Sequence, residues 1–336
     1  MRKRFGLALY LAATLFAITA NGQYRTDELG NGLLCRTIDM GTDYEGKVVC
    51  TLVKRDTPEP SKKAVLYVHG FNDYFFQSEL ADRFNAEGYN FYALDLRKFG
   101  RSYLPNQKRC NMRDISEFFA DIDTAAAIIK DEGNKNIVLM AHSMGGLTAS
   151  LYCDSKGSAC PFEALVLNSP FLELNMNWFM RKIAMPSVSL YAKMNPDMTI
   201  KQSVATGYGE SLLKSHHGEW VYDESKKTSV SPPVTSGWVR GIYRGQKKIK
   251  DGLDIKCPVL VMYSDKSVNY DDWNPEMQHA DAVLNAEDIA RYGKNLGHSV
   301  TRVKVKDGMH DLICSAPGVR KAVYNEIFCW LKKEEK

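Results

Sequence analysis

The sequence lacks the short motifs with which many enzymes hold nucleotides or metal ions. No GxxxxGK[ST] or GxGxxG pattern occurs along its 336 residues, since the GxxxxGK at 41–47 is followed by Val48, and its 7 histidines include no HExxH or comparable ligand spacing. The adjacent His216 and His217 are interpreted as surface or lid residues. We therefore expect no nucleotide cofactor and no metal ion. Internal repeats and low-complexity segments are absent as well, which excludes a repeat architecture.

Charge of one sign is not in excess either. The formal net charge is +4, and the densest basic stretch, RGQKKIK at 244–250, fits a solvated face as well as a nucleic-acid contact. We do not expect nucleic acid as a partner. With 44% hydrophobic and 25% charged residues, the chain can bury a full core, as one large domain with an insertion or as two domains.

Long hydrophobic runs are scarce, and the run near the N-terminus is short for a membrane span. Basic residues at 2–4 precede an apolar run from Phe5 to Ala20, which small and polar residues follow. Because a span needs about 20 apolar residues, we predict a cleaved signal peptide over 1–22 rather than a retained anchor. No cysteine lies at the cut, so a lipoprotein is not indicated. The mature domain would cover 23–336 and be periplasmic or secreted.

Export makes the 8 cysteines candidates for disulfides. Cys35 and Cys50 flank MGTDYEG, and a hairpin centred on 42–43 would place them opposite each other on one face. Cys153 and Cys160 bracket the short loop DSKGSA. Buried free thiols are the alternative for both pairs.

Apolar runs bounded by turn residues alternate with helical patterns along the rest of the chain. The runs that read as strands are 33–40, 46–54, 64–69, 90–95, 136–141, 162–168, 258–264 and 301–306. Segments with helical patterns are 77–88, 114–133, 287–297 and 316–333. This order predicts an α/β fold with a mostly parallel, eight-stranded sheet and helices on both faces. The interval of about 171–252 has no clear strand and predicts an inserted, mainly helical cap.

A serine follows the strand 136–141 in the stretch AHSMGG. A sharp turn from strand to helix would expose the Ser143 hydroxyl, with the Met144 N–H beside it at a helix N-terminus. Small neighbours are needed because helix and strand nearly touch there, and Ala141 adds only one methyl to the glycine usual at its position. A tight turn made for packing alone is the alternative.

Other polar positions also follow strands, at the sheet edge where ligands bind in open α/β folds. The turn HGFND at 69–73 can aim the Phe71 N–H toward the same point as the N–H after the serine, giving the two donors that an oxyanion requires. Asp265 follows the strand 258–264, with Asp271 and Asp272 as rivals, and His310 follows the last strand. The order serine, aspartate, histidine is the one this sheet topology demands of a catalytic triad.

At these positions the sequence resembles the serine aminopeptidase S33-like group of the α/β-hydrolases, which includes monoacylglycerol lipases and lysophospholipases. The resemblance covers residue 63 to the C-terminus and rests on HGFND at 69–73, DLRKFGRS at 95–102, AHSMGG at 141–146, YSDKS at 263–267 and GMHDL at 308–312. It implies the α/β-hydrolase fold. It also assigns the site: nucleophile Ser143, base His310, acid Asp265, and backbone oxyanion donors Phe71 and Met144.

Two departures from the family pattern remove no reacting group: Ala141 at the turn, and Lys98 where glycine is usual. The implied chemistry is acyl transfer through an acyl-enzyme. The expected partner is a small acyl ester resembling a monoacylglycerol or lysophospholipid, and transient contact with a membrane or lipid surface is left open. An aminopeptidase or amidase on the same scaffold, and a binding protein without turnover, are the alternatives. In the cap, Trp178, Phe179 and Met180 are expected to line an apolar acyl site, with packing as the alternative.

Overall fold

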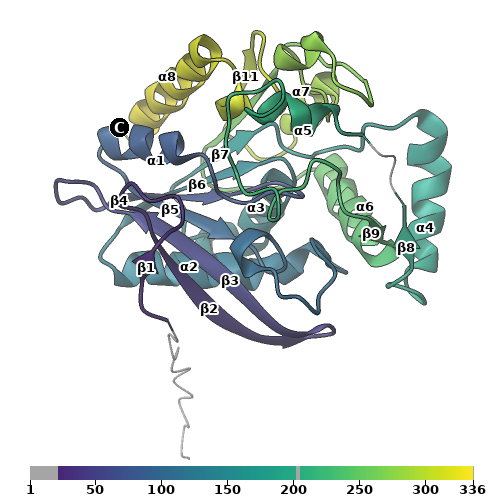
Figure 1. Cartoon of the computed structure of the whole chain (residues 1–336), viewed down its shortest axis with the longest axis horizontal. Coiled ribbons are helices and arrows are strands. Elements are labelled where there is room, and N and C mark those ends of the chain that lie inside the picture. Colours follow the sequence, from purple (N-terminus) through teal and green to yellow (C-terminus); the bar gives the residue numbers. More distant parts are fainter. Residues whose placement is uncertain (1–21, 202–204, 336) are drawn as a thin grey trace, which may run out of the picture.

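A mixed sheet of nine strands crosses the molecule in the computed structural model, which describes residues 22–201 and 205–335 (Figure 1). The sheet order is β1-β2-β3-β5-β4-β6-β7-β10-β11. Its strands are β1 Arg25–Thr26, β2 Leu34–Asp43, β3 Gly46–Arg55, β4 Lys63–Val68, β5 Asn90–Asp95, β6 Asn136–His142, β7 Ala164–Asn168, β10 Val259–Ser264 and β11 Val300–Val305. All eight predicted strands occur, and β1 is an additional two-residue strand paired with β2. The predicted signal peptide lies outside the described residues, which begin at its last position.

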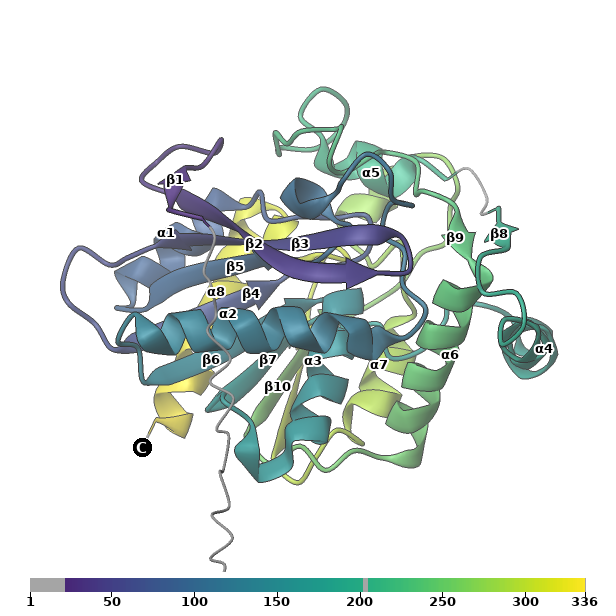
Figure 2. The same cartoon turned by 90° about the horizontal axis from the view of Figure 1, so that it is seen from below.

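Helices cover both faces of this sheet (Figure 2). They are α1 Ser78–Ala86, α2 Phe119–Asp131, α3 Met144–Lys156, α4 Met185–Tyr191, α5 Gly207–Leu212, α6 Ser236–Asp251, α7 Ala286–Gly293 and α8 Pro317–Glu334. Shorter turns of helix are η1 Gly100–Ser102, η2 Ile115–Phe118, η3 Gly157–Ala159, η4 Met180–Ala184, η5 Pro275–Gln278 and η6 Leu312–Cys314. Among the described residues, none of these helices has the length and apolar character that crossing a membrane requires.

The strand β4 shows how two cores arise from one apolar run. Successive side chains of a strand point to opposite faces. Leu66 and Val68 therefore pack in the core that α2, α3, α6 and α7 cover, whereas Val65 and Tyr67 pack in the core under α1 and α8. Because β4, β5, β6, β7, β10 and β11 run parallel, their carboxyl ends meet at one edge of the sheet.

The β2–β3 hairpin has a different register from the predicted one. Its turn lies between Asp43 and Gly46, and a bulge interrupts the pairing between Asp39 and Thr42. As a result Cys35 pairs with Val53 and Cys50 pairs with Ile38. An odd shift in register moves a side chain to the other face of the sheet, and the two thiols accordingly lie in different cores. The predicted Cys35–Cys50 bridge is therefore wrong.

Lys98 is one of the departures from the family pattern, and the structure explains why glycine is usual there. Its φ of 67° lies in the left-handed region that glycine adopts most readily. The side chain is fully buried, and its Nζ lies 2.6 Å from Asp43 Oδ2 and 2.9 Å from Glu45 Oε2. These ion pairs tie the β2–β3 turn to the loop after β5.

The segment between β7 and β10 contains the cap predicted over about 171–252, and its last helix, α6, contacts both α4 of the cap and the helical layer on the sheet. The helix α6 packs on α3, where Gly245 faces Leu151 so closely that an added Cβ would lie 2.9 Å from Leu151 Cδ1. It therefore joins the cap to the helical layer on the sheet. The cap also holds a short two-stranded sheet, β8 Thr199–Ile200 with β9 Val234–Thr235, which the sequence pattern did not predict.

Candidate active site

Ser143 lies on a strained turn between β6 and α3. Its φ of 51° and ψ of −117° are costly for a residue with a side chain. Two backbone hydrogen bonds hold this conformation: Ser143 N donates to Asn168 O at 3.1 Å, and Phe171 N donates to Ser143 O at 2.9 Å. The turn therefore carries a serine that the adjacent strand and the start of the cap fix from both sides.

Close contact between α3 and the sheet explains the small residues after the serine. A Cβ at Gly145 would clash with His69 O and lie 2.7 Å from Val68 O, and one at Gly146 would lie 2.7 Å from Pro170 Cβ. Ala141 lies in β6, before the turn, and its methyl is fully buried in the core. The glycine usual at that position is thus replaceable, whereas the two later glycines are not.

Gly145→Ala should therefore destabilise the protein by about 1–3 kcal/mol, the usual cost of forcing extra volume into a packed site. The helix must move away from the β4 backbone, so we also expect loss of activity. Urea unfolding and esterase assays measure the two effects. Gly318→Ala in α8 is the matched control, because beyond its chain neighbours and the backbone of its own helix no described atom lies within 4 Å of the added methyl, and it should be neutral or slightly stabilising. Equal stability of the two variants would contradict the packing argument.

His310 connects the serine to a carboxylate. Its Nε2 lies 3.0 Å from Ser143 Oγ, and its Nδ1 lies 2.9 Å from Asp281 Oδ2. The three residues are buried, with exposed fractions of 8% for Ser143, 3% for His310 and 0% for Asp281. A carboxylate at this distance accepts the Nδ1–H, which leaves Nε2 free to accept the proton of the hydroxyl. The geometry is that of a Ser–His–Asp triad.

The acid in this arrangement is Asp281, not the predicted Asp265. The carboxylate of Asp265 points to the loop after β11, where Oδ1 accepts the Asp307 N–H at 2.9 Å. The rivals Asp271 and Asp272 are exposed and lie on the loop between Lys266 and Asp281, called the excursion below. None of the three is hydrogen-bonded to His310 in the described part of the chain.

The excursion explains how an aspartate so far from the end of β10 reaches the histidine. Val268 N donates to Asp281 O at 3.0 Å, and Asp281 N donates to Lys266 O at 3.0 Å. The chain therefore leaves the sheet edge after Lys266 and returns to the same place at Asp281. There Asp281 Oδ1 accepts the N–H groups of Val283 at 2.9 Å and Leu284 at 2.7 Å, which orients Oδ2 toward the histidine.

The predicted oxyanion donors flank the serine. Met144 is the first residue of α3, so its N–H has no partner within the helix. Phe71 lies on the turn after β4, and the neighbouring Gly70 approaches Ser143 so closely that an added Cβ would be 3.1 Å from Ser143 Cβ. Neither N–H is hydrogen-bonded to an acceptor among residues 22–201 and 205–335. Both are thus available to a bound carbonyl oxygen.

Several residues that the sequence did not single out support the histidine loop. Asp311 is buried, and its carboxylate accepts from Asn168 Nδ2 at 2.6 Å and from Gln77 Nε2 at 3.0 Å. The Tyr208 hydroxyl of α5 accepts the Asp311 N–H at 3.2 Å, and its ring packs edge-on to His310 with centroids 5.5 Å apart. Among these residues, only Asp311 had a signal in the sequence, because it directly follows His310 within GMHDL.

His142 lies directly beside the site without joining the triad. Its ring centroid is 4.8 Å from that of His310, and its Nδ1 lies 3.1 Å from Asn168 O. Burial lowers the pKa of His142, and the nearby charge of Asp311 opposes this effect only in part. The ring therefore stays neutral next to His310 around neutral pH.

The predicted acyl-site residues of the cap are exposed to solvent. Trp178 is 68% exposed and Phe179 is 59% exposed, while Met180 starts η4 at the outer side of the cap. The helix α4 that follows lies at the outer edge of the molecule in both views (Figures 1 and 2). The predicted contact of these side chains with an acyl chain is therefore not supported by the structure.

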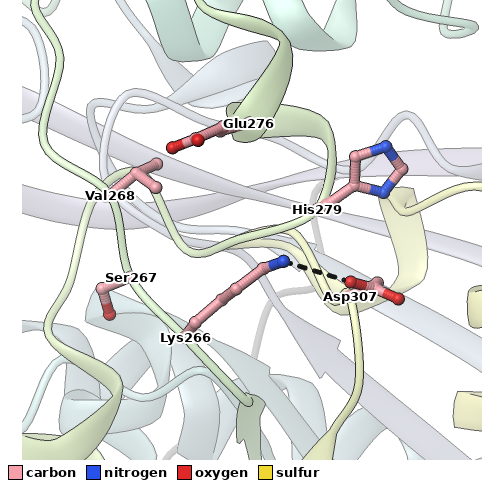
Figure 3. A pocket seen from close by; sticks show the side chains of 6 residues that line it. All are labelled: Lys266, Ser267, Val268, Glu276, His279 and Asp307. Atoms are coloured by element: carbon pink, nitrogen blue, oxygen red, sulfur yellow. Dashed lines mark hydrogen bonds and ion pairs between the residues drawn. The ribbon is translucent and has the colours of Figure 1, made fainter.

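A surface hollow of about 510 Å³ lies in the excursion that carries Asp281 (Figure 3). Its lining residues are Lys266, Ser267, Val268, Glu276, His279 and Asp307. Lys266 and Asp307 form an ion pair of 3.2 Å across it. Neither Ser143 nor His310 lines this hollow, so it is not the entrance to the candidate site. Among the described residues, no group of three or more His, Cys, Asp or Glu side chains could hold a metal ion.

Comparison with known proteins places this site in a family. The sequence profile described as "Serine aminopeptidase, S33" matches residues 59–313. A monoacylglycerol lipase of Mycolicibacterium smegmatis is 25% identical over 218 residues, which cover 62% of this chain and 72% of the relative.

Solved structures resemble the whole fold. A soluble variant of monoglyceride lipase from Saccharomyces cerevisiae gives a TM-score of 0.62 at 16% identity, covering 89% of this chain and 96% of its own. The monoacylglycerol lipase of Paleococcus ferrophilus gives 0.60 at 17% identity, with 84% and 98% covered. These matches confirm the resemblance seen in the sequence. Because the family profile matches most of the chain, the protein belongs to the serine aminopeptidase S33 family and has the α/β-hydrolase fold.

Proposed function

We propose that this protein is a serine-dependent carboxylic ester hydrolase that acts on monoacylglycerol-like or lysophospholipid-like acyl esters. The observation that carries the proposal is the line of contacts from Ser143 Oγ through His310 to Asp281, at 3.0 Å and 2.9 Å. The monoacylglycerol lipase of Mycolicibacterium smegmatis and the two solved lipases favour an ester of this kind. Export through the predicted signal peptide is part of the same proposal.

The reaction follows from the geometry in two halves. His310 Nε2 takes the hydroxyl proton as Ser143 Oγ attacks the ester carbonyl carbon, and the carbonyl π electrons move onto the oxygen. The N–H groups of Phe71 and Met144 stabilise that oxyanion. When it collapses, the ester C–O bond breaks and the alcohol leaves with the proton from His310. Water then attacks the acyl-enzyme in the same way, releasing the carboxylic acid and restoring the serine.

Two assays on the purified mature protein test the function. A fluorophosphonate probe should label Ser143 stoichiometrically, since the probe needs an activated serine. Turnover of p-nitrophenyl butyrate should exceed turnover of aminoacyl anilides, and monoacylglycerol should be a substrate. Absence of labelling would favour a binding protein without turnover. Preference for the anilides would favour the aminopeptidase alternative.

The exposed apolar residues of the cap support contact with a lipid surface as part of this proposal. They gather on one short segment and comprise Met176, Trp178, Phe179, Met180, Ile183, Leu190, Tyr191, Met194 and Met198. Exposed apolar patches of this kind are unusual on proteins that have no partner for them. A lipid-like substrate is presented by vesicles or micelles, so this face would meet the surface that holds the ester.

Replacing Trp178 and Phe179 together by serine should weaken binding to phosphatidylcholine vesicles by about 10-fold or more, since burying each ring is worth about 1.5–3 kcal/mol. Hydrolysis of vesicle-borne monoacylglycerol should fall in parallel. Turnover of soluble p-nitrophenyl acetate should stay unchanged, because neither ring contacts the triad. The control is the double replacement of Tyr44 and Tyr270 by serine, because both tyrosines are exposed outside the cap. Equal vesicle binding by both double variants would refute the lipid contact.

A further inference from the structure

The turn that carries the Phe71 N–H is held only in part by the sheet. On that side His69 Nε2 accepts the Leu96 N–H at 3.1 Å, and the His69 ring packs against Phe99. The turn itself includes Asn72, whose φ of 49° is in the left-handed region. A non-glycine residue in that region needs surrounding contacts to hold it. Those contacts come from the cap.

Thr228 of the cap pairs with the Asn72 side chain in both directions. Asn72 Nδ2 donates to Thr228 O at 2.7 Å, and the single proton of Thr228 Oγ1 is shared between Asn72 Oδ1 at 3.0 Å and Val230 O at 2.7 Å. The Thr228 N–H also points to Asn72 Oδ1 at 3.4 Å. All the hydrogen-bonding atoms of the Asn72 amide are thus turned toward one residue of the cap.

Lys227 binds the next residue of the same turn. Its Nζ lies 2.8 Å from Asp73 Oδ1, and both residues are buried, with exposed fractions of 8% and 2%. The second oxygen, Asp73 Oδ2, accepts the Gly70 N–H at 3.4 Å. The carboxylate therefore joins a cap lysine to the backbone directly before Phe71.

The charges in this pair depend on each other. Burial would raise the pKa of Asp73, but the charge of Lys227 holds that pKa below its ordinary value. A buried ion that loses its partner is strongly destabilised. The aspartate therefore stays in place and ionised only while Lys227 remains beside it.

We propose that Lys227 and Thr228 are positioning residues of the oxyanion hole: by holding Asp73 and Asn72, they fix the direction of the Phe71 N–H. The inference rests on the proposed function, because it assumes that this N–H stabilises an oxyanion. In this proposal the cap holds one of the two oxyanion donors, the Phe71 N–H, in place. Oxyanion donors act only when they are placed within hydrogen-bond distance of the developing charge.

Lys227→Met tests the proposal. We expect kcat for p-nitrophenyl butyrate to fall about 10- to 100-fold, a part of the effect that loss of a whole oxyanion donor produces, with KM changed less than about 3-fold. Lys227→Arg, which keeps the charge, should recover most of kcat. Lys226→Met is the matched control, since that neighbour pairs with Glu28 and Asp223 at the surface and should keep wild-type kcat.

A second readout separates positioning from general loss of structure. A trifluoromethyl ketone forms a hemiketal whose oxyanion occupies the same hole, so its Ki should rise by the factor by which kcat falls. Thr228→Val, a variant of nearly the same shape, should show the same pattern with a smaller factor and an unchanged thermal midpoint. If both variants are folded and keep wild-type kcat and Ki, the positioning role is wrong. If the wild-type protein neither turns over esters nor reacts with the fluorophosphonate, the proposed function itself fails.

Discussion

Replacing Ser143 by alanine is expected to lower kcat/KM for p-nitrophenyl butyrate by about 10⁴-fold or more. Alanine removes the only hydroxyl within hydrogen-bonding distance of His310 Nε2 among the described residues, so no acyl-enzyme can form. The backbone donors remain and supply only residual catalysis. The fold should stay intact, because the serine hydroxyl makes no other side-chain hydrogen bond in the described part of the chain.

Ser150→Ala is the matched control for this experiment. Ser150 is a buried serine of α3, the helix that follows Ser143, and its hydroxyl donates to Gly146 O at 2.7 Å within that helix. Alanine suits a helix interior, so this variant should keep wild-type kcat/KM. Assays at equal folded concentration, with folding checked by circular dichroism, decide the matter. A Ser143→Ala protein that kept a tenth of wild-type activity would remove Ser143 from the role of nucleophile.

The strands of the sheet were predictable because their signal is local. An apolar run between turn residues specifies a buried strand, and the eight predicted runs all form one. Ser143 and His310 could be placed for the same reason, since Ser143 directly follows β6 and His310 lies on the turn after β11. The parallel order of β6, β7, β10 and β11 places both residues at the same edge of the sheet, where their side chains meet at 3.0 Å.

Features that depend on loop path or register were not predictable in the same way. The hairpin register differs by the bulge near Asp39, which no apolar pattern reveals, and this moved Cys50 to the other face. The acid was misplaced because the chain makes a long excursion between Lys266 and Asp281, closed by backbone hydrogen bonds that have no sequence signature. A short apolar pair, Val283 and Leu284, before a helix N-cap was the only hint that the chain returns there.

The cap shows a third limit, because an apolar side chain can serve packing, substrate or a surface contact. Trp178 and Phe179 were expected to line the acyl site, yet they are exposed. Other cap residues reach the candidate site: the ring of Tyr208 packs on His310, and the polar residues Lys227 and Thr228 bind the turn after β4. Their role depends on contacts 154 and 156 residues distant in sequence, and composition could not have indicated them.

Asp281→Asn should reduce kcat by about 10⁴-fold, the effect known for the equivalent change in well-studied triads. The carboxylate lies 2.9 Å from His310 Nδ1 and accepts its proton. An amide in that position can turn its NH₂ group toward the ring, which favours the tautomer with the proton on Nε2. That tautomer cannot accept the proton of Ser143. It also leaves the imidazolium formed during attack without a buried counter-charge.

Asp265→Asn is the comparison that separates the two candidate acids. The Asp265 carboxylate only accepts the Asp307 N–H at 2.9 Å, and an amide oxygen can accept the same bond. We therefore expect less than about a 3-fold change in kcat for this variant, because the hydrogen bond is retained. Even its complete loss would cost only about 0.5–1.5 kcal/mol of stability. Single-turnover rates with p-nitrophenyl butyrate, measured for both variants at the same pH, make the comparison independent of deacylation. A large loss in Asp265→Asn with little loss in Asp281→Asn would return the acid role to Asp265, and would require the excursion to rearrange in the active enzyme.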